Sequence, residues 1–314
     1  MSLRAIVRAL GGDLYQGGRR ANIPAPGHSA ADRSVSLVMV RGRVVIHCFG
    51  DARWQDVRDD LRRRGLLDGC GEEAGVQTAQ RPDGSARRRR ATQLWADGVV
   101  TGPSGLVARH LASRALVWDR RFEDLTEQPA APVSIYGRGG GARRAMMAAI
   151  RDPDGALAAV ELTYLDRSAR RAEGLILSRK TVGEVPPGSA VRLRPVARSL
   201  LVGEGVITTL SAMTRFDMPG WALLSAGNLA GWSVPPGVEK VLIAADRGVA
   251  GEAAARRLQA RTRAAGVRCA IAWPPASQGD WNEVLRLDDR REEEGPGGAP
   301  EKRGWAPPPA GVPP

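Results

Sequence analysis

The stretch LLVGEG, residues 200–205, decides the fold of the C-terminal part because it reads as a buried strand that ends at Glu204. The stretch VLIAAD, residues 241–246, repeats the pattern and ends at Asp246. A helix-like segment follows each stretch. Short apolar runs that alternate with helical runs are typical of a parallel sheet with flanking helices. We therefore predict an α/β domain of this kind over residues 199–287.

The two acidic residues lie where an open α/β sheet binds its ligands, at the carboxyl ends of strands. Two carboxylates at neighbouring strand ends can hold Mg²⁺ or Mn²⁺ beside a phosphodiester, with substrate oxygens completing the shell. We therefore expect Glu204 and Asp246 to be metal ligands, and Gly205 leaves room for a phosphate or metal near the backbone. Asp280 is a third candidate ligand. Alternatively, Glu204 is a helix-start charge and Asp280 is the N-cap of a short helix.

Taken together, these blocks resemble the Toprim domain, the catalytic fold shared by bacterial-type primases, topoisomerases and some nucleases. The family pattern is a strand ending in Glu-Gly, a later strand ending in Asp-x-Asp with an Ala-Gly turn into a helix, and an acidic third block. Glu204-Gly205, Asp246 and Ala250-Gly251 match this pattern in type and order. The resemblance implies that Glu204 is the general acid/base, that Asp246 is the main metal ligand, and that Gly251 lies against the bound group.

One carboxylate of the family pattern is missing, because the second Asp would fall at Gly248. Mg²⁺ or Mn²⁺ would then bind weakly, bind only with substrate, or recruit Asp280 or Glu252. Three functions stay open: magnesium-dependent nucleotidyl transfer that makes RNA primers in the replication of a mobile element or chromosome, DNA binding without catalysis, and DNA cleavage by a Toprim nuclease.

The region before this domain, residues 91–198, is predicted to be a small mixed α/β region. It resembles the segment that leads into Toprim in plasmid- and phage-type primases and primase–helicases. The resemblance implies phosphate contacts at Lys180 and Arg192; plain surface charge is the alternative. We predict helices at residues 103–116 and 142–150, and strands at residues 157–165 and 175–178.

The N-terminal segment, residues 1–67, contains an alternating stretch at residues 35–49 that predicts a β-hairpin. An amphipathic helix from Trp54 that Gly65 ends should follow. The segment resembles the zinc ribbon of these primases, but of its ligands only His28 and Cys48 survive.

The expected fourth ligand falls at Asp51 or Ala52, and a structural zinc site needs four nitrogen or sulfur ligands. We therefore expect a degenerate, ribbon-like module without zinc.

The chain has 46 basic and 34 acidic residues and a net charge of +12, which makes a polyanion the natural partner. We expect single-stranded DNA, and nucleotides if the site is active. The candidate contacts are Arg87, Arg88, Arg89 and Arg90, in a basic linker over residues 68–90, and Arg247 beside Asp246.

Residues 288–314 should form a disordered tail. The glycine-rich residues 137–141 lack the Lys-Ser or Lys-Thr of a phosphate loop, so a replicative helicase would be a separate partner. No apolar run reaches the length that spans a membrane, and we expect a cytoplasmic protein.

Overall fold

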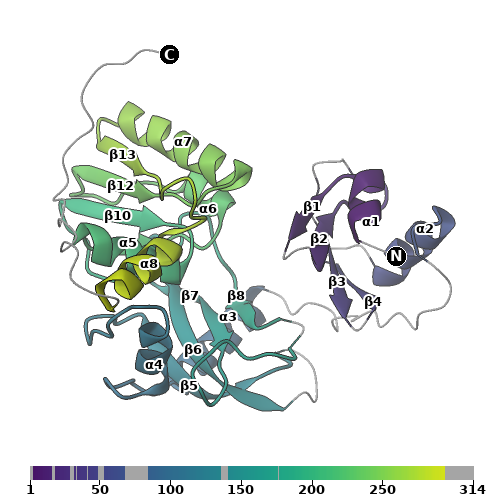
Figure 1. Ribbon diagram of the computed structural model, residues 1–314, viewed down its shortest axis with the longest axis horizontal. Coiled ribbons are helices and arrows are strands. Elements are labelled where there is room, and N and C mark those ends of the chain that lie inside the picture. Colours follow the sequence, from purple (N-terminus) through teal and green to yellow (C-terminus); the bar gives the residue numbers. More distant parts are fainter. Residues whose placement is uncertain are drawn as a thin grey trace. The chain divides into compact units, whose positions relative to one another are not determined.

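The computed structural model describes residues 3–15, 18–28, 32, 34–40, 42–48, 53–67, 84–135, 141–175 and 177–293. The chain divides into two units, Met1–Arg81 and Pro82–Pro314, each with a hydrophobic core of its own (Figure 1). None of the helices in these described ranges is long and apolar enough to cross a membrane.

The first unit is a four-stranded antiparallel sheet with two helices. The strands β1 (Asp13–Tyr15), β2 (Arg20–Ile23), β3 (Val35–Val40) and β4 (Arg43–Cys48) lie in that order. The helices α1 (Leu3–Leu10) and α2 (Trp54–Arg63) pack on the sheet through residues such as Leu3 and Leu61, which are fully buried. The predicted hairpin and the helix from Trp54 are confirmed.

The second unit begins with α3 (Gly84–Ala96) and α4 (Leu106–Ala112) and continues into a four-stranded antiparallel sheet. Its strands lie in the order β5 (Leu125–Pro132), β6 (Ala142–Arg151), β7 (Leu157–Tyr164) and β8 (Arg179–Gly183). Helix α3 covers one face of this sheet, where Leu94 shares a buried cluster with Met147 and Leu162. On the other face, Met146, Ala148 and Ile150 join a cluster that also contains Leu106 of α4.

The structure corrects the predicted helix at residues 142–150, which is strand β6. All six residues from Ala145 to Ile150 are buried, because both faces of the strand are covered. A strand of this kind shows a continuous apolar run without alternation, and such a run cannot be told from a buried helix by its period.

Further boundaries differ from the predictions, and the helix predicted at residues 103–116 covers only Leu106–Ala112. Residues 84–90 of the predicted linker form the start of α3, in which arginine is a good helix former, while residues 68–83 lie outside the described residues. The strand predicted at residues 175–178 begins only at Arg179. Residues 288–293 of the predicted tail belong to α8 (Trp281–Glu293), and the rest of it lies outside the described residues.

The second sheet of this unit is the predicted parallel α/β sheet. Its strands lie in the order β13 (Arg268–Ala272), β12 (Lys240–Ala244), β10 (Ser199–Gly203), β11 (Gly220–Ala222) and β9 (Val191–Arg192), and only β9 is antiparallel. Helices α5 (Val206–Phe216) and α8 pack on one face, and α6 (Ala226–Gly231) and α7 (Val249–Ala264) pack on the other (Figure 1).

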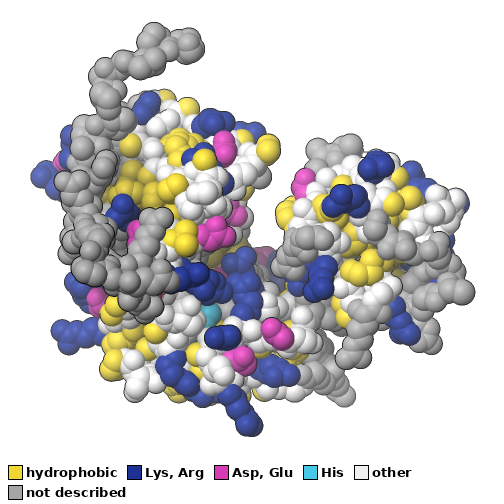
Figure 2. Space-filling view, viewed as in Figure 1, with side chains coloured by type: hydrophobic (Ala, Val, Ile, Leu, Met, Phe, Trp, Pro, Cys, Tyr) yellow, Lys and Arg dark blue, Asp and Glu magenta, His cyan; other side chains and the backbone are white. Residues whose placement is uncertain are grey.

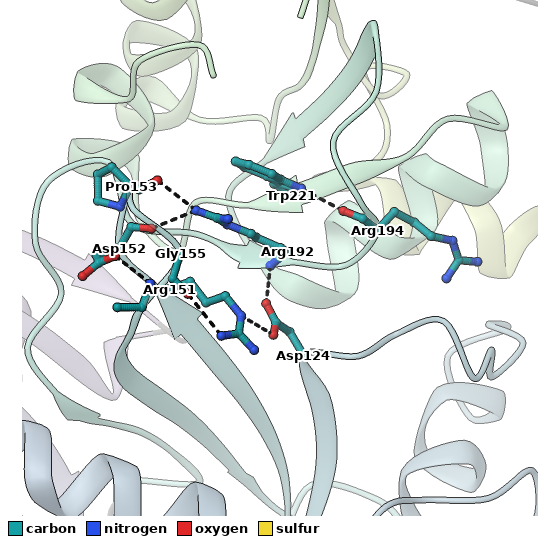
Figure 3. A network of polar contacts seen from close by, with 9 residues as sticks. Asp124, Arg151, Asp152, Pro153, Gly155, Arg192, Arg194 and Trp221 are labelled. Carbon is teal, nitrogen blue, oxygen red and sulfur yellow. Dashed lines mark hydrogen bonds and ion pairs between the residues drawn. The ribbon is translucent and has the colours of Figure 1, made fainter. Parts of the chain in front are cut away.

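A polar network joins the two sheets of this unit (Figure 3). The Asp124 carboxylate accepts from Arg151 Nε at 2.7 Å and from the backbone N–H of Arg192 at 2.9 Å. The Arg192 guanidinium donates to the Asp152 carbonyl at 2.9 Å and lies 4.7 Å from the ring centroid of Trp221. Arg192 therefore connects the loop after β6 to the edge of the parallel sheet.

Candidate active site

Glu204 and Asp246 leave adjacent parallel strands at the same edge of the sheet. Strands β10 and β12 pair in register, with Gly203 opposite Ala244, so both acidic residues follow the last paired positions. Gly203 has no room for a side chain, because a Cβ there would lie 2.6 Å from Thr209 Oγ1. The missing side chain lets α5 pack closely against the end of β10.

Asp280 is brought to this edge by a backbone contact. The N–H of Arg247 donates to the carbonyl of Gly279 at 2.8 Å and ties the loop after β12 to the start of α8. Asp280 Oδ1 accepts from the backbone N–H of Glu283 at 2.9 Å, and Glu283 Oε2 accepts from the N–H of Gly279 at 2.7 Å. The N-cap alternative for Asp280 is therefore confirmed.

The three carboxylates act on one another electrostatically. Burial, followed by the charges of Glu204 and Asp280, raises the pKa of Asp246 to about 7. Burial also raises the pKa of Glu204, against the charge of Arg179 and a hydrogen bond from the backbone N–H of Ala226. Asp246 Oδ1 is buried and accepts no hydrogen bond from the described residues. A buried carboxylate oxygen without a partner is a candidate cation ligand.

The donor set fits a hard divalent cation, since both strand-end residues offer carboxylate oxygens. Among the described residues, however, no three His, Cys, Asp or Glu side chains form a cluster that holds a metal ion as they stand. Gly248, at the position of the missing carboxylate, has φ +124°, and a Cβ there would meet no atom within 4 Å. The protein thus offers Glu204 and Asp246 for a cation, and other oxygens would have to complete its shell.

The two candidate glycines lie at the starts of the helices that follow the two acidic strand ends. Gly205 is the N-cap of α5, and its carbonyl accepts from the N–H and the hydroxyl of Thr209 at 2.8 and 2.7 Å. A Cβ on Gly251 would lie 3.1 Å from the carbonyl oxygen of Asp246, so this glycine lets the first turn of α7 approach the end of β12.

Several of the predicted DNA-binding residues are engaged by the protein itself. Lys180 Nζ donates to the carbonyl of Val133 and lies 5.8 Å from the ring centroid of Tyr164, and burial lowers the pKa of Lys180. Arg247 donates to the carbonyl of Pro274 through Nε and Nη2, at 3.0 and 2.7 Å.

The remaining candidates lie on α3 and in the junction between the sheets. Arg87 forms an ion pair with Glu184 at 2.7 Å, and Arg89 donates to the hydroxyl of Ser85 at 3.0 Å. Arg88 and Arg90 lie on the same helix and are partly exposed. Arg192 belongs to the junction of Figure 3.

Two arginines that the sequence reasoning missed lie on the other face of the antiparallel sheet from Lys180. Arg144 pairs with the buried Glu127 at 2.5 Å, and Arg179 lies 3.7 Å from the buried Glu161. Both arginine side chains remain half exposed, at 50% and 51%. Alternation along β8 could show only that Arg179 and its neighbour Lys180 point to opposite faces, and not which face is covered.

The two residues predicted to remain from a zinc ribbon, His28 and Cys48, lie at two places in the first unit. His28 Nδ1 lies 3.0 Å from Asp32 Oδ2 in the segment after β2. Cys48 ends β4, and burial, followed by the charge of Asp56, raises the pKa of its thiol to about 11. Asp51 and Ala52 lie outside the described residues.

The order of the parallel strands and the acidic residues at two adjacent strand ends define a Rossmann-like α/β domain with an acidic site. Residues 199–290 match the family model of the Toprim domain, which bears out the predicted resemblance for this part of the chain. Residues 85–193 match a second model, described as a domain of unknown function (DUF7146).

Three primase fragments are among the solved structures to which the chain is similar. The primase fragment of the bacteriophage T7 primase-helicase protein is 17% identical, with 87% of this chain and 97% of that chain covered and a TM-score of 0.39. The zinc-binding and RNA polymerase domains of Aquifex aeolicus primase are 15% identical, with 93% and 81% covered and a TM-score of 0.42. A DnaG primase catalytic domain bound to ssDNA is 15% identical, with 67% and 82% covered and a TM-score of 0.44. No curated protein matches the sequence.

Proposed function

We propose that this Toprim-domain protein acts on DNA as a primase-like nucleotidyltransferase in the replication of a mobile element or chromosome. The observation that carries the proposal is the buried Oδ1 of Asp246, which has no hydrogen-bond partner among the described residues. The charges of Glu204 and Asp280 also raise the pKa of Asp246. Carboxylates that repel one another at strand ends are retained at a cost in stability, and a bound cation would remove that cost.

The proposed reaction joins a ribonucleotide to a 3′-hydroxyl. The hydroxyl oxygen attacks the α-phosphorus, the bond to the pyrophosphate leaving group breaks, and Glu204 takes the hydroxyl proton. The partly buried carboxylate of Glu204 suits this role, because burial raises its pKa above the ordinary value. Mg²⁺ or Mn²⁺, held by Glu204 and Asp246, would neutralise the phosphate charge. Asp280 then caps α8 and acts on the site through its charge alone.

The basic side chains give the proposed DNA partner its contacts. Figure 2 shows Lys and Arg side chains spread over the visible face, with fewer acidic ones among them. Glu127 and Glu161 are buried carboxylates, and each holds an arginine whose other side is exposed. The positive charge of Arg179 also acts to lower the pKa of Glu204. In this proposal Arg144 and Arg179 contact the phosphate backbone of a bound single strand.

A second function, DNA binding without catalysis, is favoured by Gly248. The position offers no carboxylate, and the described residues hold no ready-made cluster of three metal ligands. Such a protein would use the same arginines and keep the sheet as a scaffold.

A primer-synthesis assay separates these functions. The protein is incubated with single-stranded DNA, ribonucleotides and Mg²⁺ or Mn²⁺, alone and beside a separate helicase. We expect RNA products that are lost in Glu204→Gln and Asp246→Asn. Asp217→Asn is the matched control, because Asp217 ends α5 at its far end, in a left-handed conformation that Asn tolerates. Shortened DNA would indicate a nuclease, and DNA binding without either product would indicate the non-catalytic function.

A further inference from the structure

Arg247 follows Asp246 in the chain, and its side chain holds the backbone of another segment. The guanidinium donates to the carbonyl of Pro274 through Nε at 3.0 Å and through Nη2 at 2.7 Å. Pro274 itself is buried. Two donors from a charged group on one carbonyl make a strong tether, because a hydrogen bond with an ionised partner is stronger than one between neutral groups.

The backbone of Arg247 holds the same segment at its other end. The N–H of Arg247 donates to the carbonyl of Gly279 at 2.8 Å, and Gly279 directly precedes Asp280. Residues 274–279 lie between β13 and α8. One residue therefore fastens both ends of the segment that leads to Asp280.

Asp246 lies between two backbone hydrogen bonds to this part of the chain. Before it, the N–H of Ala245 donates to the carbonyl of Ala272 at 3.1 Å, and after it comes the backbone contact of Arg247. The next residue, Gly248, has φ +124° and no side chain that could hold the loop. The side chain of Arg247 therefore anchors the loop that carries Asp246 beside the position where the backbone has the most freedom.

The ring of Trp273 supports the guanidinium of Arg247. Arg247 Cζ lies 5.6 Å from the ring centroid, and Trp273 packs against a buried cluster of the parallel sheet. Arg256 Cζ lies 5.7 Å from the same ring, but Arg256 pairs with Glu252 of its own helix at 3.2 Å. The two arginines thus share a charge and a ring, and of the two it is Arg247 that fastens residues 274–279.

We propose that Arg247 is a positioning residue, which fastens the loop after β12 to residues 274–279 and so holds the Asp246 carboxylate in place for a divalent cation. The inference rests on the proposed function for the role of Asp246 as a cation ligand. The fastening itself can be tested without a cation and without a reaction. It gives Arg247 a task within the protein in place of the DNA contact expected from the sequence.

The first arm of the test measures hydrogen exchange by mass spectrometry over residues 274–283, without metal ions or DNA. Arg247→Met should fold, since Arg247 is exposed, and it removes both donors to Pro274. We expect the amides of this segment to exchange about three- to tenfold faster than in wild type, as for the loss of one hydrogen bond. Arg256→Met is the matched control and should exchange as wild type does. Equal exchange in Arg247→Met and Arg256→Met would overturn the proposal.

The second arm measures Mn²⁺ affinity by calorimetry, where the charge of Arg247 and its positioning role have opposite effects. Arg247→Met removes a positive charge beside the site, which by itself would tighten Mn²⁺ binding. We expect binding to weaken by about tenfold instead, the lower end of the range for residues that orient a metal ligand. Arg247→Lys, whose ammonium can still donate to the Pro274 carbonyl, should recover part of the affinity, and Arg256→Met should retain all of it.

The outcomes of the two arms separate the inference from the proposed function. Mn²⁺ binding by Arg247→Met that is as tight as that of wild type, or tighter, would overturn the inference. If wild type does not bind Mn²⁺ either, the proposed function is contradicted, and hydrogen exchange alone decides whether Arg247 fastens the loop.

Discussion

Asp280 Oδ1 lies 2.9 Å from the backbone nitrogen of Glu283, so the carboxylate that helps to raise the pKa of Asp246 is also the N-cap of α8. One side chain thus has a structural task and an electrostatic effect. The two can be separated, because a neutral amide caps a helix as well as a carboxylate does.

Asp280→Asn should therefore keep the stability of the protein and change only the charge at the site. We expect its free energy of unfolding to match wild type within about 0.5 kcal/mol, whereas Asp280→Ala should lose about 1 kcal/mol with the cap. Urea denaturation followed by tryptophan fluorescence measures both. Binding of Mn²⁺ should weaken little in Asp280→Asn. A loss of Mn²⁺ affinity as large as that of Asp246→Asn would instead identify Asp280 as a ligand.

Arg179 and Lys180 are neighbours on β8 with opposite expected roles. Arg179 is half exposed beside Glu161, whereas Lys180 donates to a backbone carbonyl on the other face. Arg179→Gln should weaken single-stranded DNA binding and reduce the slope of log K against log salt by about 0.7, the value for one lost phosphate contact. Lys180→Met, which keeps the apolar stem, should leave the slope unchanged. Equal slopes in the two variants would contradict this placement of the DNA.

Arg179 and Lys180 also show what could not be predicted from the sequence. Strand ends can be recognised from an apolar run and the residue that follows it, which is why Glu204 and Asp246 were found. The choice between Arg179 and Lys180 depends on which face of β8 is covered. Helix α3 covers one face, and residues 84–90 of this helix were predicted to be part of a linker. Which face is covered depends on the tertiary contact between α3 and the sheet, and the local sequence pattern does not show that contact.

The predicted helix at residues 142–150 failed for a related reason. Ala145 to Ile150 are buried on both faces, and this removed the alternation by which a strand is recognised. The positive φ of Leu224, +72°, was equally invisible, since a leucine at positive φ has no sequence signature. The order of the elements in the parallel sheet and the acidic residues at its strand ends could be predicted from the sequence. Which faces of a strand are covered, and which turns have a positive φ, could be seen only in the structure.

His110 provides a test of the buried core of the second unit. Its Nδ1 lies 2.7 Å from the carbonyl of Ala169, so the neutral ring donates there. Burial is the largest cause that lowers the pKa of His110 below its ordinary value, and the charges of Arg114 and Arg171 act in the same direction. A lowered folded-state pKa means that the unfolded chain binds the proton more tightly.

The stability that His110 contributes is therefore present above its ordinary pKa and is lost as the pH falls toward the lowered value. We expect the difference in free energy of unfolding between wild type and His110→Gln to shrink from about pH 8 to about pH 5. Comparing the two proteins cancels groups common to both, including the raised pKa of Asp246, which acts in the opposite direction. A difference that stays constant over this range would show that His110 is not held neutral.

The junction between the two sheets depends on the shape of the Arg192 guanidinium. Its Nη2 donates to the carbonyls of Asp152 and Pro153, at 2.9 and 3.1 Å, while its face lies over Trp221. A lysine cannot stack and bridge in this way, so Arg192→Lys should cost about 1–3 kcal/mol of stability. Arg198→Lys is the control, because Arg198 is 83% exposed and its pair with Glu239 is solvated. Equal melting temperatures for the two variants would contradict a structural role for Arg192.

Gly248 allows the missing carboxylate to be put back. A side chain there meets no atom within 4 Å, but φ +124° is strained for any residue except glycine, so Gly248→Asp and Gly248→Ala should each lose about 1–3 kcal/mol. The two variants share this strain and differ only in the carboxylate. If the site holds a divalent cation through Glu204 and Asp246, Gly248→Asp should bind Mn²⁺ about tenfold more tightly than Gly248→Ala by calorimetry, a gain of about 1.4 kcal/mol. Equal affinities would mean that the carboxylate at position 248 does not face the cation, and that the acidic strand ends serve another purpose.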